Sequence, residues 1–403
     1  MKLKHIQYLL FFAICAISCS SNKQMKDDVP FIDVSKTYPE KELNIIDFAD
    51  VSYVHFDTDD DDYIYKGEIS YITKNTYVVC DISSSSILFF SRDGTPKSRI
   101  NRLGQGPEEY LTLYRSDRIL YDEETDDVFL CNNSLESMNH YIQVYSSTGE
   151  YKRKINLPRN TLPWSLVSFD NKSLFVFAED FYSGPNARKY KETEIPYTTY
   201  YKISKLNGEI LDSFKLKSNN VNLVILHSIR DTYVSDRMAF SRLVKGNDGL
   251  FLCNPETDTV FYYNEKKSLT PVLHKTPLVR NQDPRVVLTN VVDVERFMFF
   301  STYTLISAHM NLRDKHYFLD KETGEIFQQK LILPDFKGKE FTIQVGRTSV
   351  NAGGDVADYM FELELYELKE AYKENRLSGK LKELVSTLDE DKDNNVYMLV
   401  KFK

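Results

Sequence analysis

The stretch Asn101–Tyr110, NRLGQGPEEY, gathers two glycines, a proline, two carboxylates and a tyrosine. It lacks the Gly-Lys-Ser/Thr ending of a P-loop, and no helical pattern follows it, as a dinucleotide fingerprint requires. Adjacent side chains of an extended segment point to opposite faces, so Glu108 and Glu109 are not placed as a catalytic pair. The stretch predicts a tight loop that either joins two pieces of sheet or contacts a ligand. Its candidate ligand-binding residues are Arg102, Gln105, Glu108, Glu109 and Tyr110.

Three other residues are predicted to shape this loop, namely Gly104, Gly106 and Pro107. Glycine adopts positive φ without steric cost, so both glycines can take it here. Proline fixes its own φ and restrains the residue before it. These three residues are therefore assigned a structural role.

Two acidic runs suggest calcium. Asp57–Asp62 is a run of like charges, which is typical of a solvated loop. Asp389–Asn395 begins like an EF-hand loop, but Asn394 stands where the glycine belongs and Val400 where the bidentate glutamate belongs. No metal and no cofactor are therefore predicted.

Other signatures of chemistry are weak. The histidines show no His-Glu-x-x-His spacing, and no Gly-x-Ser-x-Gly elbow is present. A polar loop begins at FYSGPN, Phe181–Asn186, where Tyr182 and Tyr190 could stack on a sugar ring; a mobile loop is the other interpretation. The catalytic residues, if any, are unknown from the sequence.

These residues must be positioned by a repeated element. Hairpins with a glycine turn recur at Gly94, Gly149, Gly208 and Gly324, with gaps of 55, 59 and 116 residues. The last gap is twice 58, which is close to each of the other gaps, and a hairpin without glycine, with its turn at Asn264–Lys267, fills it. Repeats of roughly 57 residues with about four strands each indicate propeller blades.

The predicted fold class is all-β, a six-bladed β-propeller. A ring of blades is closed when both chain ends contribute to one blade. We expect Asp47–Asp57 to pair with the final strand, NVYMLVKFK. Residues 357–388 have helix formers with apolar residues at three and four spacing, which predicts one or two helices inserted in the last blade, with a break near Ser378–Gly379.

The ends of the chain indicate export. Lys2 and Lys4 precede a short apolar run, Ile6–Ile17, that is typical of a signal peptide. Ser18–Cys19 resembles a lipobox, so residues 1–19 are assigned to signal and lipobox, with the lipid on Cys19. Plain secretion and an uncleaved anchor are the alternatives. Residues 20–40 are expected to be a tether and residues 41–403 the propeller.

The net charge bears on nucleic acid as a partner, and the cysteine positions bear on disulfide pairing. The net charge of −8 argues against nucleic acid. Cys80, Cys131 and Cys253 each follow two apolar residues and occupy similar places in different repeats. They are therefore expected to be buried free thiols rather than disulfide partners.

The motif GQGPEEY, the lipobox and the repeat spacing together resemble a bacterial six-bladed β-propeller lipoprotein family, which is itself similar to NHL propellers. Glu108 stands where glycine is common in that motif. The resemblance implies a propeller fold and an outer-membrane lipoprotein that faces the periplasm or the surface. It implies no established activity.

The favoured function is therefore binding or scaffolding of a glycan, peptide or protein partner. The alternative is a propeller enzyme, such as a lyase, lactonase or glycosidase, with its site at the central channel. An enzyme should gather several His, Asp, Glu or Asn side chains at one mouth.

Overall fold

The structure is a computed structural model of the 403-residue chain. It describes residues 29–58, 61–111, 113, 119–133, 140–158, 161–178, 197–217, 225–229, 232–236, 243–246, 248–254, 257–305, 312–344, 351–352 and 359–403. Cys19 and the loop at Phe181–Asn186 with Tyr190 lie outside these residues, and so do positions 59 and 60 of the acidic run.

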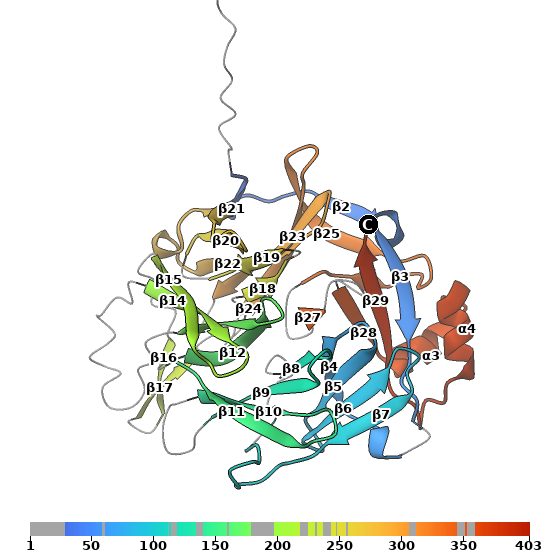
Figure 1. Ribbon diagram of the computed structural model, residues 1–403. Coiled ribbons are helices and arrows are strands. Elements are labelled where there is room, and N and C mark those ends of the chain that lie inside the picture. Colours follow the sequence, from blue (N-terminus) through green and yellow to red (C-terminus); the bar gives the residue numbers. More distant parts are fainter. Residues whose placement is uncertain are drawn as a thin grey trace, which may run out of the picture.

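Five sheets of four or more strands are arranged around a central axis (Figure 1). Each is named a blade and is built from consecutive antiparallel strands. Blade one contains β4 (Gly67–Ile72), β5 (Thr76–Asp81), β6 (Ser86–Ser91) and β7 (Pro96–Ile100). Blade two contains β8 (Ile119–Asp122), β9 (Asp127–Asn133), β10 (His140–Tyr145) and β11 (Tyr151–Asn156). Blade three contains β12 (Thr161–Ser168), β13 (Ser173–Ala178), β14 (Tyr197–Ser204) and β15 (Ile210–Lys217).

The remaining two blades lie in the second half of the chain. Blade four contains β18 (Leu243–Lys245), β19 (Gly249–Leu252), β20 (Thr259–Asn264) and β21 (Leu269–Thr276). Blade five contains β22 (Arg285–Asp293), β23 (Phe297–Leu305), β24 (Leu312–Asp320) and β25 (Glu325–Ile332), with β26 (Glu340–Phe341) paired to β25. A hairpin of β16 (Ile225–Ile229) and β17 (Thr232–Asp236) lies between blades three and four in the sequence, and a short 3-10 turn (Val279–Asn281) precedes blade five.

Both chain ends meet in a closing sheet of three strands. β3 (Ala49–Val54) pairs antiparallel with β29 (Val396–Phe402), and β29 pairs with β28 (Tyr359–Leu363). The predicted pairing of the amino-terminal segment with the final strand is therefore confirmed. A short helix, α1 (Ile45–Phe48), precedes β3, and a 3-10 turn (Asp61–Tyr63) follows it.

The predicted six-bladed fold class is wrong, because the chain has a five-blade arrangement. Counting hairpins assigned a full blade of four strands to the end of the chain, but among the described residues the closing sheet has three strands. The segment before β28 instead contributes β27 (Asn351–Ala352), which pairs in parallel with β4 of blade one. Figure 1 shows β27 near the centre of the ring.

The helical insertion predicted for residues 357–388 is present but shorter, because Tyr359–Leu363 forms the strand β28. Between β28 and β29 the chain forms α3 (Leu365–Lys373) and α4 (Gly379–Thr387), which lie at the outside of the ring (Figure 1). Gly379 has a φ of +54°, and it begins the second helix at the expected break. Leu368 and Leu381 are fully buried in the core that the helices share with the closing sheet.

The amino-terminal segment is more than a tether. β1 (Phe31–Asp33) pairs in parallel with β21, and β2 (Glu40–Asn44) pairs in parallel with β25. The segment therefore covers the outer edges of blades four and five before it enters the closing sheet. We name these two strands the strap.

Turn chemistry and aromatic packing explain why the repeat folds this way. The four repeat glycines have φ between +73° and +92°, the left-handed region that favours glycine. In the copy without glycine, Lys267 takes this conformation with a φ of 58°. Aromatic rings join neighbouring blades, as where Phe214 of blade three lies 4.8 Å from Tyr263 of blade four.

Candidate functional site

The motif loop, residues 101–110, connects β7 of blade one toward β8 of blade two. The chain folds back on itself, because the Tyr110 N–H donates to the Arg102 carbonyl at 3.0 Å and the Gly104 N–H to the Tyr110 carbonyl at 3.1 Å. The strands of a blade alternate in direction, so this connection leaves blade one at the same end as its β5–β6 turn. The loop is thus a compact element at one end of the blades.

The glycines of the loop leave room for the Glu109 side chain and do not supply positive φ. Neither Gly104 nor Gly106 has a left-handed φ, which the sequence had allowed. A Cβ at Gly104 would lie 1.9 Å from Oε2 of Glu109. That same Oε2 accepts a hydrogen bond from the Gly106 N–H at 2.8 Å. Glu109 therefore closes the loop from inside.

Blade two holds the backbone of the loop. The amide of Gln143, on β10, donates to the Glu109 carbonyl at 3.1 Å, and the Tyr145 hydroxyl donates to the Glu108 carbonyl at 3.0 Å. The buried Tyr110 donates its hydroxyl to the Ser85 carbonyl of blade one at 2.6 Å. Burial raises the pKa of Tyr110 to about 12, so it remains a donor at neutral pH. The motif is a junction between two blades.

The five candidate ligand-binding residues therefore separate into two groups. Tyr110 is fully buried and Glu109 is half-buried within the loop. Arg102, Gln105 and Glu108 are exposed, although the Arg102 Nε donates to the Gly149 carbonyl at 2.9 Å. The structure brings these three side chains to one loop whose backbone is hydrogen-bonded to blade two, and their contact with a ligand stays a prediction.

The sequence did not single out Glu362, on β28. Its carboxylate accepts a hydrogen bond from Asn395 at 2.7 Å, and the Tyr65 hydroxyl donates to the Tyr397 hydroxyl at 2.8 Å beside it. Burial, with an added contribution from Glu68, raises the pKa of Glu362 above its ordinary value. In the sequence, Glu362 lies in a segment that favours helix. Nothing there predicted its place between the closing sheet and blade one.

A second group missed by the sequence is a Ser–His–Asp row in blade five. The Ser301 hydroxyl lies 2.9 Å from Nδ1 of His316, and Nε2 of His316 lies 3.2 Å from Asp314. Burial lowers the pKa of His316, which keeps a neutral base available. Ser301 is 0 % exposed, however, and pairs directly with His316 across β23 and β24. We therefore assign the row to polar packing within the blade, since a nucleophile must reach its substrate.

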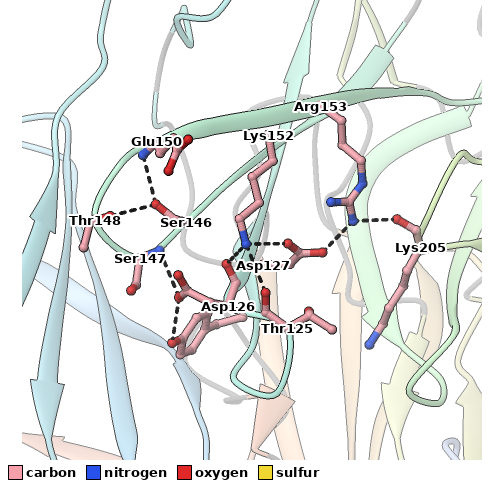
Figure 2. Close-up of polar contacts among 11 residues, drawn as sticks. Thr125, Asp126, Asp127, Ser146, Ser147, Thr148, Glu150, Lys152, Arg153 and Lys205 are labelled. Atoms are coloured by element: carbon pink, nitrogen blue, oxygen red, sulfur yellow. Dashed lines mark hydrogen bonds and ion pairs between the residues drawn. The ribbon is translucent and has the colours of Figure 1, made fainter.

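The opposite end of blade two carries an ionic cluster, shown in Figure 2. Asp127 accepts from Lys152 at 2.9 Å and from Arg153 at 2.5 Å, and Arg153 also donates to the Lys205 carbonyl of blade three at 3.0 Å. Burial acts to raise the pKa of Asp127, but the hydrogen bonds from Arg153 and Lys152 outweigh it and hold the pKa below its usual range. This cluster joins blades two and three.

The three cysteines lie in the core, and the two acidic runs contact each other. Cys80, Cys131 and Cys253 are buried, as the repeat predicted. Asp393 accepts from the Thr58 hydroxyl at 2.8 Å, so the two acidic runs of the sequence meet beside the closing sheet. Within the described part of the chain, no three His, Cys, Asp or Glu side chains are grouped as metal ligands.

None of the helices in the described residues has the length and apolar character needed to cross a bilayer. No protein among curated sequences matches this chain significantly.

Solved structures share the fold. A Bacteroides fragilis NCTC 9343 protein described as exported is 16% identical, covers 93% of this chain and 99% of its own, and has a TM-score of 0.58. More distant similarity extends to an oligogalacturonate lyase in complex with manganese (13% identity, 70% and 66% coverage, TM-score 0.36). A Pyrococcus horikoshii acylaminoacyl peptidase is similarly distant (13% identity, 77% and 48% coverage, TM-score 0.35).

A family profile matches residues 29–401, from just before the strap to the last strand. The match includes the motif loop, all five blades and the closing sheet. The chain therefore belongs to the family described as Domain of unknown function (DUF4934).

Proposed function

We propose that this protein is an exported, membrane-anchored propeller that binds a glycan, peptide or protein partner through the end of the blades that carries the motif loop. The observation that carries this proposal is that blade two holds the backbone of the loop while two of its polar side chains are exposed. The carbonyls of Glu108 and Glu109 accept hydrogen bonds from Tyr145 and Gln143, whereas the side chains of Gln105 and Glu108 are exposed and make no hydrogen bond to the described parts of the blades. A loop whose backbone is already held in place loses little backbone entropy on binding.

The carboxyl groups with raised pKa values have partners within the protein, and this favours binding over catalysis. In the described residues the pKa is raised for two carboxyls, those of Asp293 and Glu362, in both cases chiefly by burial. Asp293 pairs with Lys321 at 2.8 Å and Glu362 accepts from Asn395. These groups are used in packing between strands, whereas an enzyme needs them free to reach a substrate.

A glycan and peptide array with the purified protein, repeated with metal chelated, tests the proposal. For a ligand found there, Gln105→Ala and Glu108→Gln should each weaken binding several-fold without changing the midpoint of thermal unfolding. The matched control is Glu124→Gln, because Glu124 is exposed in the β8–β9 turn at the other end of blade two. Equal binding by all three variants would exclude the motif loop as the site.

Glu109→Gln separates the two roles of the motif. Because Glu109 closes the loop through Gly106, its neutral variant should keep the fold and lose partner affinity if the loop is a binding site. A large fall in the unfolding temperature with unchanged affinity would assign the motif to the blade junction alone.

Anchoring is proposed through lipid on Cys19. Export agrees with the short apolar run of the amino terminus, which reads as a signal peptide. Cys19→Ser should abolish incorporation of labelled fatty acid and move the protein from the membrane pellet to the supernatant. Labelled protein in the serine variant would contradict lipidation at this residue.

A further inference from the structure

A cluster of exposed apolar side chains lies on the turns of blades three and four. Leu206, in the β14–β15 turn, is 72% exposed, and Ile210 and Leu211, at the start of β15, are 51% and 47% exposed. Leu269, which begins β21, is 36% exposed. These are four of the ten large apolar side chains that the described residues expose, and we name them the apolar corner.

The β14–β15 turn differs from the turns of other blades. Leu206 lies two residues before the turn glycine of blade three. At the same position, blades one, two and five have Arg92, Ser147 and Glu322. The turn itself therefore does not require an apolar residue at this place.

The start of β15 shows the same change. Leu211 lies at a register shift, where the pairing of β14 with β15 leaves it without an opposite residue. The corresponding shifts leave Lys97 of β7 and Lys152 of β11 in that position. Lys97 donates to the Thr76 hydroxyl at 2.9 Å and Lys152 to Asp127 at 2.9 Å, and a leucine makes no such contact. Blade three therefore exposes an apolar group where the two blades before it have a cation.

An ion pair joins the two turns of the apolar corner. Asp212, next to Leu211, accepts from Lys267 of the β20–β21 turn at 3.0 Å and from the Tyr263 hydroxyl of β20 at 3.2 Å. Tyr263 pairs with Leu269 across its own hairpin. The start of β15 and the start of β21 are therefore held together.

The apolar corner lies at the end of the ring opposite the motif loop. The β14–β15 and β20–β21 turns join the third strand of a blade to the fourth, whereas the motif loop follows the fourth strand of blade one. The strands of a blade alternate in direction, and the blades repeat the same order around the axis. A surface that contacts the corner therefore leaves the motif loop free.

The amino-terminal segment indicates what contacts the corner. The described chain begins at Val29, and the Pro30 carbonyl accepts from the His274 N–H of β21 at 2.9 Å. Nine residues lie between Cys19 and Val29, and an extended chain of that length spans about 30 Å. A lipid on Cys19 would therefore hold blade four, and Leu269 with it, close to the bilayer.

We propose that the apolar corner inserts into the lipid of the membrane that carries the anchor, so that the motif loop faces away from the bilayer. This inference rests on the membrane anchoring proposed above. Apolar side chains that transfer from water into the membrane interface stabilise such a contact. Lys266 and Lys267 are exposed beside Leu269, but Glu209 and Glu265 are exposed as well. Apolar transfer rather than charge therefore carries the contact.

Tethering without the acyl chain tests the contact separately from lipidation of Cys19. The chain from residue 20, which keeps every described element, is held by an amino-terminal histidine tag on vesicles that contain a nickel-chelating lipid. Its three cysteines are buried, so an environment-sensitive dye is attached selectively at Leu211→Cys. Binding to the vesicles should raise the emission of this dye several-fold, and nitroxide-labelled lipid should quench it. Ile82→Cys is the matched control, because Ile82 is 46% exposed in the β5–β6 turn at the other end of the ring and its dye should not respond.

Free partition measures the size of the contribution. On vesicles of phosphatidylethanolamine and phosphatidylglycerol without the chelating lipid, flotation should show weak binding that persists in high salt, because screening does not weaken apolar transfer. Leu206→Ser should lower the partition coefficient about tenfold, since one leucine side chain no longer leaves water. Ile82→Ser should leave it unchanged.

The other outcomes overturn the proposal. A dye at Leu211→Cys that stays dim and unquenched on the tethered protein would show that the propeller moves freely on its tether, and a response at Ile82→Cys instead would place the motif end against the membrane. Emission that rises with protein concentration in the absence of vesicles would assign the corner to a second copy of the chain. Absence of free partition, or partition that Leu206→Ser does not change, likewise contradicts insertion. Because the tag replaces the lipid, a failure of Cys19 to incorporate fatty acid alters none of these results.

Discussion

Among the described strands, none pairs with the outer strands of blades one and two, which we call bare, whereas the strap covers those of blades four and five. On the bare strand β11, Lys152 and Arg153 are tied back to Asp127 of the same blade (Figure 2). On the covered strand β25, Lys330 faces Glu40 and Glu42 of β2 at 3.7 and 3.5 Å. Cations on a bare edge discourage pairing, and cations on a covered edge contact the added strand. The same residue type therefore serves opposite purposes in the two regions.

The largest expected effect comes from the apolar anchor of the strap. Ile32 on β1 is fully buried in the core that includes Phe251 of blade four and Met298 of blade five. Ile32→Ala should lower the free energy of unfolding by about 3 kcal/mol, because it removes buried methyl groups and leaves a cavity. Urea denaturation measures this change.

The neighbouring residue provides the control for the anchor. Phe31 is 58% exposed on the same strand, so Phe31→Ala should change the stability by less than about 1 kcal/mol. Equal losses in the two variants would mean that burial of Ile32 does not set its contribution, and Ile32 would then not be the apolar anchor of the strap.

The ionic anchor of the strap should have a smaller effect that depends on pH. Asp320 is fully buried, accepts from Arg296 at 3.2 and 2.9 Å, and lies 3.5 Å from Lys41 of β2. The hydrogen bonds from Arg296 hold its pKa below the ordinary 3.8. Asp320→Asn should cost about 2 kcal/mol at neutral pH, since it removes charge-assisted hydrogen bonds.

The sign of the pH dependence follows from this lowered pKa. The folded state binds the proton less readily than the unfolded state, so the stabilisation is complete above pH 3.8 and is lost as the pH falls through the folded pKa. Thermal unfolding of parent and Asp320→Asn should therefore converge in acid. Glu322→Gln is the control, because this exposed partner of Arg296 should contribute less than about 0.5 kcal/mol. Parallel curves at every pH would assign the effect to packing.

The repeat predicted more of the fold than of the site. The turn glycines, the pairing of β3 with β29 and the two helices are local or periodic signals, and each is confirmed. The number of blades is not local: β27 pairs with blade one instead of completing the closing sheet, and a two-residue strand leaves no periodic trace. Proline and short polar residues likewise concealed that residues 31–33 form β1.

The candidate site was predictable in position and less so in geometry. GQGPEEY was correctly placed between two blades. The role of Gly104 depends on where the Glu109 side chain lies in the folded loop, which sequence spacing does not reveal. Glu362 lies beside Tyr397 because β28 pairs with β29, and the residue numbers alone give no such contact. Contacts set by strand register across distant segments were the part that the sequence did not reveal.

The smallest effect on stability is expected at the bare edge itself. Lys154 on β11 is exposed and lies 3.9 Å from the centre of the Tyr141 ring, without an ion pair among the described contacts. Lys154→Val should change the free energy of unfolding by less than about 0.5 kcal/mol. It should nevertheless speed aggregation on mild heating, because an apolar residue replaces the charge that guards an open edge.

The same substitution on a covered edge completes the test. Lys330→Val on β25 removes exposed ion pairs to Glu40 and Glu42, yet β2 still occupies the edge, so light scattering should rise no faster than in the parent protein. Faster aggregation of Lys330→Val than of Lys154→Val would show that β2 detaches readily. The strap would then protect β25 from aggregation less well than the cations of β11 protect β11. The contrast between the covered and the bare strands would reverse.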